Sequence, residues 1–434
     1  MSETAVSEAS PGPHPPISRR QVAAAVAGNA LEFYDFTTYA YFAIQIGDVF
    51  FPRHTPFIRL MLSLATFGAG FILRPIGSII IGRFADTVGR RPAMLLSFTI
   101  MGLAILGVAL TPSYASIGPL APVLVVLWRL AQGFALGGEV GPTTAFLVEA
   151  APAERRGFYG AWQSASQNMA QIFGGLVGVT LATSTGPAGL EHWGWRLAFL
   201  LGAATLPFGL ILRRSLPETL HRSEAGRPAG ASRPTFAAHR RVIVLGLALI
   251  AGSTVSTYAF NFMTTFAMAH LHMAPGVSLG ATLANGAFGL VGALAGGLLS
   301  DRFGRRTMMI WPRIAFLMVT WPAYYLMIRN HDAATLLGAT ALLAFLSNLS
   351  VAAVIVAITE SLRKEIRGAA MGAVYATAVA VFGGTTQPAI EELIHLTGDR
   401  LSPAWYVMSF TVIALVASAM MRESAVRSLR LAQA

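Results

Sequence analysis

Five ionisable residues of this sequence fall inside long apolar stretches, where a charge is costly. They are Glu32, Asp35, Arg74, Arg129 and Glu139. In a membrane-spanning helix such a residue pairs with another polar group or faces a water-filled cavity, and it marks a substrate path or a proton relay by default. We therefore expect the three carboxylates to carry protons. The two guanidiniums suit an anion, because their planar fork matches a carboxylate.

The alternative for these charges is purely structural. Asp35 and Arg129 can form a buried ion pair that only fixes helix packing, and Glu139, deeper toward one end of its helix, fits that alternative best. Arg196 and Arg313 lie near the ends of apolar stretches, where a long side chain reaches the interface by snorkelling. The second half of the chain has no clear charge at mid-helix, so we expect the charge chemistry in the first half.

Neutral polar residues add to the candidate site. Gln163, Gln167 and Gln171 recur at every fourth position and so share one helix face. Glutamines in a spanning helix can simply bond neighbouring helices, but three on one face favour a wet cavity. In the second half the candidate ligands are Tyr258, Asn261 and Gln387, with Asn285, Asn348 and Tyr375 as further mid-helix polar residues.

Two copies of one charged loop, 82–91 and 297–306, each join two apolar stretches. Each copy holds an acid and a glycine that permits a tight turn. The spacing predicts a charge network that closes one side of the protein in one state and breaks in the other. Its members are Asp86, Gly89, Arg90, Arg91 and Glu149 in the first half, and Asp301, Gly304, Arg305, Arg306 and Glu360 in the second.

The composition indicates the elements that must position these residues. The chain has 434 residues, of which 54% are hydrophobic and only 12% charged, against about 25% charged in a soluble protein. Its mean hydropathy is +0.60, and it has no cysteine, which excludes disulfides. The net charge of +11 does not indicate nucleic-acid binding, because the arginines gather in short loops between apolar stretches. We predict an all-α, multi-pass membrane protein.

A spanning helix needs about 20 mainly apolar residues. Twelve stretches qualify: 22–47, 60–82, 93–111, 119–149, 158–183, 195–213, 242–268, 279–299, 308–328, 335–360, 369–394 and 403–422. We expect a disordered tail, a six-helix bundle, a polar central loop, a second six-helix bundle and a short tail. Their predicted bounds are 1–18, 19–212, 213–241, 242–423 and 424–434.

The distribution of Lys and Arg predicts the orientation. With the N-terminus in the cytoplasm, the cytoplasmic loops hold 23 basic residues and the outer loops four, so both termini are expected inside. The two halves are expected to be parallel repeats, because Asp86 and Asp301 differ by 215 positions and Glu149 and Glu360 by 211. Parallel repeats place a substrate site between the halves near the midplane.

No phosphate-binding loop, metal-spaced histidine cluster or nucleophile elbow occurs in the sequence. We therefore expect no enzyme activity, no cofactor and no metal, and a solute gradient as the driving force. The remaining alternative in another class is a non-transporting membrane sensor, although the 29 residues of 213–241 leave little room for a signalling domain.

The paired loops resemble the signature of the major facilitator superfamily, and Arg129-Leu130-Ala131-Gln132-Gly133 resembles its fourth-helix motif, whose arginine is associated with proton coupling. More closely, the chain resembles the metabolite:proton symporter family and, within it, the citrate–proton symporters. The stretches that carry this resemblance are GNALEFYDF (28–36), FILRPIGS (71–78), LWRLAQGFALGGEVG (127–141), GFYGAWQSASQ (157–167), GWRLAFLLG (194–202), RRSLPET (213–219) and LTGDRLSPAWY (396–406).

The resemblance implies a proton symporter of the bacterial inner membrane that imports a small organic anion and acts as a monomer. The chain departs from the citrate carriers at Phe33-Tyr34, where they have Gln-Phe, and at Gln387, where they have proline. Both departures fall on helices expected to line the cavity. We therefore expect citrate or a related di- or tricarboxylate, with another small metabolite, such as an aromatic acid or a betaine, as the alternative.

Overall fold

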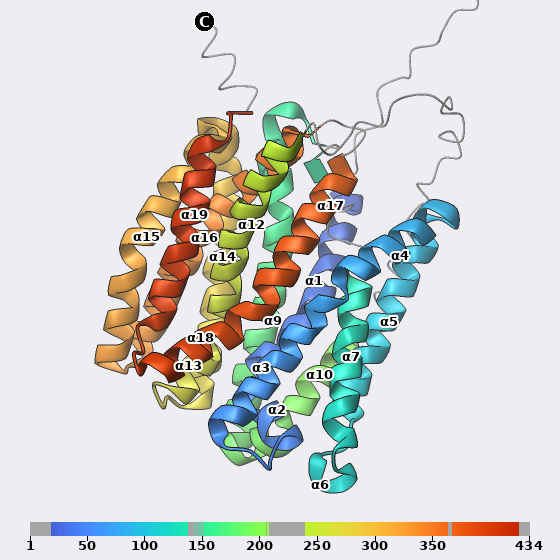
Figure 1. Cartoon of the computed structure of the whole chain (residues 1–434), viewed down its shortest axis with the longest axis vertical. Helices are drawn as coiled ribbons and strands as arrows, with labels where there is room; N and C mark the ends of the chain where they lie inside the picture. Colours follow the sequence, from blue (N-terminus) through green and yellow to red (C-terminus); the bar gives the residue numbers. More distant parts are fainter. Residues whose placement is uncertain are drawn as a thin grey trace, which may run out of the picture.

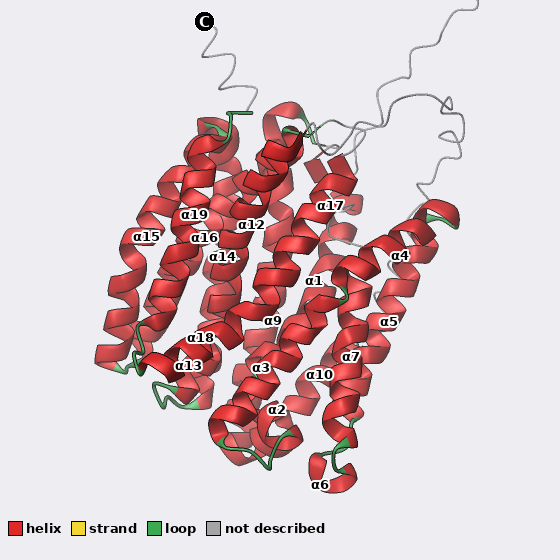
Figure 2. Cartoon of the chain, viewed as in Figure 1, coloured by secondary structure: helices red, strands yellow, loops and turns green. Residues whose placement is uncertain are grey.

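The structure, a computed structural model, describes residues 19–137, 144, 147–148, 151–204, 206–207, 239–362 and 367–424. These residues form a bundle of roughly aligned helices, without a strand among them (Figures 1 and 2). The predicted tail 1–18 and most of the predicted central loop 213–241 and of the tail 424–434 lie outside the described residues.

The helices fall into two sets along the chain. The first set is α1 (Arg19–Tyr41), α2 (Ala43–Phe50), α3 (Pro56–Ile72), α4 (Arg74–Thr87), α5 (Arg90–Leu110), α6 (Tyr114–Ile117), α7 (Leu120–Leu136), η1 (Ala153–Arg155), α9 (Arg156–Gly189), η2 (Leu190–Gly194) and α10 (Trp195–Ala204). The second set is α12 (Arg240–Asn261), α13 (Met263–Ala269), α14 (Pro275–Phe303), α15 (Arg305–Asn330), α16 (Ala333–Glu360), α17 (Arg367–Ala378), η5 (Val379–Gly383), α18 (Gly384–Thr397) and α19 (Ser402–Met420).

Several of the predicted spans consist of two helices joined at a break. One break at Leu73 separates α3 from α4, where Pro75 lacks the backbone N–H that would continue the helix. Phe262 separates α12 from α13, and the π-helical turn η5 separates α17 from α18. In the described chain, six stretches are long and apolar enough to cross a membrane: Pro56–Phe84, which includes the break at Leu73, Pro92–Leu110, Arg240–Asn261, Pro275–Phe303, Ala333–Glu360 and Ser402–Met420.

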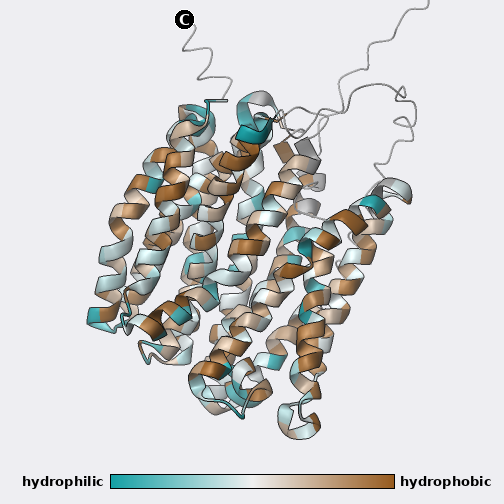
Figure 3. Cartoon of the chain, viewed as in Figure 1, coloured by the Kyte–Doolittle hydropathy of each residue, from teal (hydrophilic) through white to brown (hydrophobic). Residues whose placement is uncertain are grey.

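The surface of the bundle is apolar along its length. On α15, Trp311 and Met318 are 66% and 72% exposed, which suits contact with lipid chains. In Figure 3 much of the hydrophilic colour lies near the helix ends, and further teal segments occur halfway along the bundle. Because lipid cannot satisfy polar groups, the mid-bundle polar residues must face the protein interior.

The two sets of helices pack closely on each other through glycines. The long helices α9 and α14 touch along their lengths, and a Cβ at Gly175 would come within 2.5 Å of the backbone nitrogen of Leu283. At a second contact, a Cβ at Gly68 of α3 would come within 2.4 Å of the carbonyl oxygen of Gly384 in α18. Small residues at these positions let the backbones approach.

The two repeated loops lie at the same end of the bundle, the upper end in Figure 1, which we call the motif end. Gly89 has a φ of 133° and Gly304 a φ of 98°. Because side chains with a Cβ rarely adopt these values, the sequence prediction that glycine permits both turns is confirmed.

Candidate functional site

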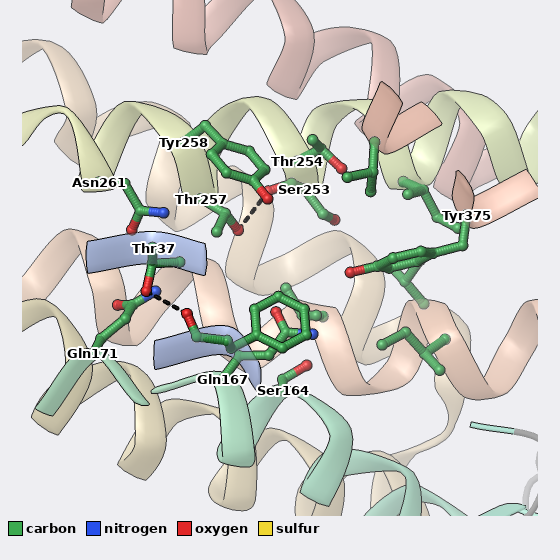
Figure 4. A pocket seen from close by; sticks show the side chains of 16 residues that line it. Thr37, Ser164, Gln167, Gln171, Ser253, Thr254, Thr257, Tyr258, Asn261 and Tyr375 are labelled. Atoms are coloured by element: carbon green, nitrogen blue, oxygen red, sulfur yellow. Dashed lines mark hydrogen bonds between the residues drawn. The ribbon is translucent and has the colours of Figure 1, made fainter. Parts of the chain in front are cut away.

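A central cavity lies between the two sets of helices. Figure 4 shows Thr37, Ser164, Gln167 and Gln171 on one side of it and side chains of α12 on the other. The lining residues are Phe33, Thr37, Ser164, Gln167, Gln171, Ile250, Ser253, Thr254, Thr257, Tyr258, Asn261, Val351, Val354, Ile355, Tyr375 and Val379. All of these side chains are uncharged, so direct contacts with a solute would be hydroxyl, amide and aromatic.

One face of α12 supplies most of the polar lining. Ser253, Thr254, Thr257, Tyr258 and Asn261 recur at intervals of three and four residues, which places them on the same side of a helix. The buried Asn261 has an Oδ1 atom without a hydrogen-bond partner among the described residues. An unsatisfied buried amide oxygen is costly, and a solute hydroxyl or a water in the cavity would satisfy it.

Arg74 lies directly behind this lining. It is the first residue of α4, only 3% exposed, and its guanidinium carbon is 4.4 Å from the ring centroids of both Phe36 and Phe71. Tyr258 lies close enough for its hydroxyl to interact electrostatically with this guanidinium. The Nε and Nη2 atoms of Arg74 have no partner among the described residues, so this cation retains donors for an anion.

Arg129 is held more completely than Arg74. Its guanidinium donates to Gln132 Oε1 at 2.5 Å and to the carbonyl oxygens of Phe36 and Phe67 at 3.3 and 3.4 Å. The same group lies 4.3 Å from the ring centroid of Phe36 and 4.7 Å from that of Tyr39. Arg129 is fully buried and does not line the cavity, so its first role is to join α7 to α1 and α3.

The predicted proton carriers lie on α1 or outside the described residues. Glu32 is buried at 2% exposure, and Asp35 follows it by three residues on the same helix, although its side chain is not described. Glu139 is not among the described residues. Near Glu32, Asn29 donates to Ser166 at 2.6 Å and accepts a longer bond, 3.5 Å, from Gln163, so Gln163 faces α1 rather than the cavity.

Amide pairs connect the two sets of helices beside the cavity. Asn285 of α14 donates to Gln171 Oε1 at 2.7 Å, and Asn168 of α9 donates to Asn348 Oδ1 at 2.9 Å. Gln387 does not line the cavity; it donates to the carbonyl oxygen of Tyr258 at 3.4 Å. It therefore steadies the backbone of α12 where that helix presents Tyr258.

At the motif end, the predicted network of the second loop is assembled. Asp301 accepts from the backbone nitrogens of Gly157 and Phe158 at 2.7 and 2.9 Å, and from Arg305 Nη1 at 2.7 Å. Arg305 also donates to Glu360 at 3.3 Å. Burial by itself lowers the pKa of Arg305, but the carboxylates of Glu360 and Asp301 outweigh it and hold that pKa above its usual value.

This network crosses between the two sets of helices. Gly157 and Phe158 begin α9 of the first set, and Arg156 beside them lies 3.7 Å from Glu360 of the second set. A carboxylate at a helix N-terminus also gains from the helix dipole. The side chain of Arg306 points elsewhere and donates to the carbonyl oxygen of Ala419, while its backbone nitrogen shares the carboxylate of Glu423 with that of Arg305.

The first loop cannot be compared atom by atom with the second. The side chains of Asp86, Arg90 and Arg91 are not described, and Glu149 lies outside the described residues. At the opposite end, the rings of Phe57 in α3 and His395 in α18 stack with centroids 3.8 Å apart. Contacts between the two sets therefore exist at both ends of the cavity.

Residues 33–388 match the Major Facilitator Superfamily. The chain belongs to the major facilitator superfamily. It is accordingly a multi-pass membrane transporter of twelve helices in two halves, and its relatives are transporters rather than enzymes.

Three relatives of different named function align with most of this chain. It is 38% identical to a citrate-proton symporter of Klebsiella pneumoniae, over 89% of this chain and 88% of the relative. It is 32% identical to an alpha-ketoglutarate permease of Escherichia coli, over 93% and 94%. A proline/betaine transporter of Salmonella typhimurium is 30% identical, over 95% and 85%.

A solved structure agrees in fold. A partially occluded inward-open conformation of the xylose transporter XylE from E. coli superposes with a TM-score of 0.73, covering 93% of this chain and 98% of that one. The sequence identity of 17% limits this likeness to the fold.

Within the superfamily fold, the sequence analysis found only part of the lining. Of its seven predicted substrate ligands, Gln167, Tyr258 and Asn261 line the cavity. It did not single out Thr37, Ser253, Thr254 and Thr257, which also line it. The repeat of hydroxyl residues at intervals of three and four along α12 was the available signal for three of them.

The expectation for Arg313 was wrong. Arg313 is 5% exposed and points into the second half, where it bonds Ser418 and Ser253, rather than reaching an interface. The second half therefore does hold a buried charge at mid-helix, eight residues after the first residue of α15.

Proposed function

We propose that this transporter is a proton symporter that imports a small organic anion, citrate or a related di- or tricarboxylate. Two named relatives support a carboxylate, the 38% identical citrate-proton symporter and the 32% identical alpha-ketoglutarate permease. The uncharged polar lining of the cavity suits the hydroxyl and carboxylate oxygens of such a solute.

The observation that carries the proposal is the state of Arg74. This buried guanidinium lies behind Tyr258, contacts the rings of two phenylalanines and retains donors without a partner among the described residues. A planar, charged fork with free donors matches a carboxylate. A small shift of Tyr258 would let the anion and the guanidinium meet directly.

Protons would enter through Glu32 and Asp35 on α1. Importing an anion against an inside-negative potential costs about 2.3 kcal/mol per charge per 100 mV, and co-transported protons offset that cost. A substrate that occupies Arg74 competes with these carboxylates for the same positive charge and so favours their protonation. The proton gradient is then the driving force, without a cofactor.

The proposed setting is the bacterial inner membrane, with the motif end and both termini in the cytoplasm and the monomer as the working unit. The excess of Lys and Arg in the loops of that end supports the orientation. The network of Asp301, Arg305 and Glu360 would then be a cytoplasmic gate that breaks when the halves rock around the cavity.

A second candidate is a proton-coupled carrier of a betaine, because a proline/betaine transporter is 30% identical over most of its length. A betaine has a carboxylate for Arg74, but its quaternary ammonium is best held by aromatic rings. Tyr258 and Tyr375 line the cavity and provide such rings, so the cavity also suits a betaine.

The test is uptake of labelled citrate by purified protein in proteoliposomes, with and without an inward proton gradient. Unlabelled tricarballylate, succinate, shikimate and betaine serve as competitors. We expect gradient-stimulated uptake that the anions tricarballylate, succinate and shikimate inhibit and the zwitterion betaine does not. Absence of citrate uptake, together with gradient-stimulated uptake of labelled betaine in a parallel assay, would replace the carboxylate proposal with the second candidate.

A further inference from the structure

Arg313 occupies a second, smaller cavity inside the C-terminal half. This cavity is lined by Gly252, Ser253, Ser256, Arg313, Phe316, Ser347, Ser350 and Thr411, from α12, α15, α16 and α19. Arg313 lies about 12 Å along α15 from its start, at 1.5 Å per residue. A charge at that depth is costly unless it has a partner or a task.

The partners of Arg313 in the described chain are neutral. Its Nη1 donates to the carbonyl oxygen of Met309 at 3.1 Å and to Ser418 Oγ at 2.7 Å, and its Nη2 donates to Ser253 Oγ at 3.2 Å. None of the ion pairs found among the described residues includes Arg313. The positive charge is therefore anchored on one side, by Ser418, and directed on the other toward Ser253.

Ser253 lines both cavities. Its hydroxyl accepts from Arg313 and donates to the carbonyl oxygen of Leu249 at 3.0 Å. A hydroxyl proton can rotate to a better acceptor, and a carboxylate in the central cavity is a better acceptor than a backbone carbonyl. With one lone pair engaged by the guanidinium, Ser253 can turn its proton to an anion.

Arg74 and Arg313 thus occupy comparable positions in the two halves. Arg313 lies behind Ser253 and is hydrogen-bonded to its hydroxyl, and Arg74 lies behind Tyr258, close enough for an electrostatic interaction with its hydroxyl. Ser253 and Tyr258 are five residues apart on α12, about 7.5 Å along its axis. A short solute lying along this helix would meet one cation near each end.

We propose that Arg313, acting through Ser253, is a specificity-determining residue that selects substrates with two or more carboxylates. This inference rests on the proposed carboxylate transport. It adds that the transporter prefers substrates with more than one negative charge. A substrate with one carboxylate uses Arg74 alone, whereas a di- or tricarboxylate gains from both cations. Arg313 is a positioning residue in this scheme, because it acts through the serine.

The test compares inhibition constants for citrate, succinate and the monoanion shikimate in the wild type and in three variants. Ser253→Ala removes the hydroxyl that connects Arg313 to the cavity, and Arg313→Gln removes the charge. Ser256→Ala is the matched control, because Ser256 lines the same small cavity but its hydroxyl donates to the carbonyl oxygen of Gly252. A hydrogen bond to a charged group corresponds to about tenfold or more in affinity. We expect Ser253→Ala and Arg313→Gln to weaken the binding of citrate and succinate by that factor. The inhibition constant of shikimate should change far less.

Ser256→Ala should leave the order of the three affinities as in the wild type. If Ser253→Ala leaves that order unchanged while the wild type binds citrate, the inference about Arg313 is overturned and carboxylate transport stands. If the wild type binds none of the three carboxylates, the proposed function falls first and this inference with it. Ser253→Ala keeps Arg313 in place, so a folding failure of Arg313→Gln does not block the test.

Discussion

At the scale of single residues, substitutions of Arg74 can test the shape of its guanidinium separately from its positive charge. The guanidinium carbon lies 4.4 Å from the ring centroids of both Phe36 and Phe71, and an ammonium does not reproduce the contacts of a planar, delocalised guanidinium with such rings. We predict that Arg74→Lys weakens citrate binding about tenfold or more and that Arg74→Gln abolishes it, measured by competition in proteoliposomes. Arg59→Lys, at an exposed ion pair with Asp48, is the matched control and should bind citrate normally. Full binding by Arg74→Lys would show that charge alone suffices.

The two acids of α1 lead to a different prediction. Glu32 is buried, and Asp35 follows it within one helical turn. We predict that Glu32→Gln or Asp35→Asn retains exchange of internal for external citrate but loses accumulation driven by a proton gradient, because the neutral amide carries no proton. Asp332→Asn, at the N-terminus of α16, should retain both activities. If the two α1 variants accumulate citrate normally under the gradient, neither acid is the proton carrier.

The sequence predicts which residue types are costly inside a membrane, but not which way each one faces. Gln163, Gln167 and Gln171 share a helix face by their spacing, yet Gln163 faces Asn29 while the other two line the cavity. Arg313 was assigned to an interface because it lies near the start of its span. Its direction depends on α19 and α12, whose packing against α15 is not encoded in local spacing.

At the scale of helices, apolar length predicted the spans, and the breaks within them were missed. The breaks at Leu73, at Phe262 and in η5 occur at mid-bundle. Hydropathy reports how apolar a stretch is, and it is nearly the same for a straight helix and a broken one. Irregular backbone at membrane depth is tolerated where it is buried in protein or lines a cavity, which fits the position of these breaks around Arg74 and Tyr258.

The contact between α9 and α14 depends on glycines that hydropathy treats as ordinary small residues. A Cβ at Gly175 would lie 2.5 Å from a backbone nitrogen that cannot move aside as a side chain could, whereas one at Gly338 in α16 would meet nothing within 4 Å. Overpacking costs about 1–3 kcal/mol, while an unhindered Gly→Ala change gains about 0.4–1 kcal/mol. We predict that Gly175→Ala lowers the Tm of the purified protein by several degrees and Gly338→Ala leaves it equal or higher. Equal Tm values for the two variants would mean that the helices separate easily.

At the scale of the whole molecule, alternating access requires that contacts between the halves exist at one end while those at the other end break. The motif end has a polar latch, in which Asp301 holds the first turn of α9, and the opposite end has a ring stack of Phe57 on His395. The repeat in the sequence predicted the members of the latch in the second half. It did not predict that Asp301 bonds the other half, since that contact joins residues 144 positions apart.

The contacts of Asp301 lead to a prediction about how often the motif end is open. Asp301→Asn removes the charge that binds Arg305 and the two backbone N–H groups of α9, so the motif end should open more often. Because the natural chain has no cysteine, Thr257→Cys in the cavity lining provides a single thiol. In inside-out vesicles we expect an impermeant maleimide to label this thiol several-fold faster when Asp301→Asn is added. In right-side-out vesicles the same change should slow the labelling.

The control is Asp332→Asn, at an acid that caps α16 without joining the halves, and it should change neither rate. Equal labelling in both backgrounds would mean that Asp301 stabilises the second half without holding the halves together, and faster labelling only from the other side would reverse the proposed orientation of the motif end.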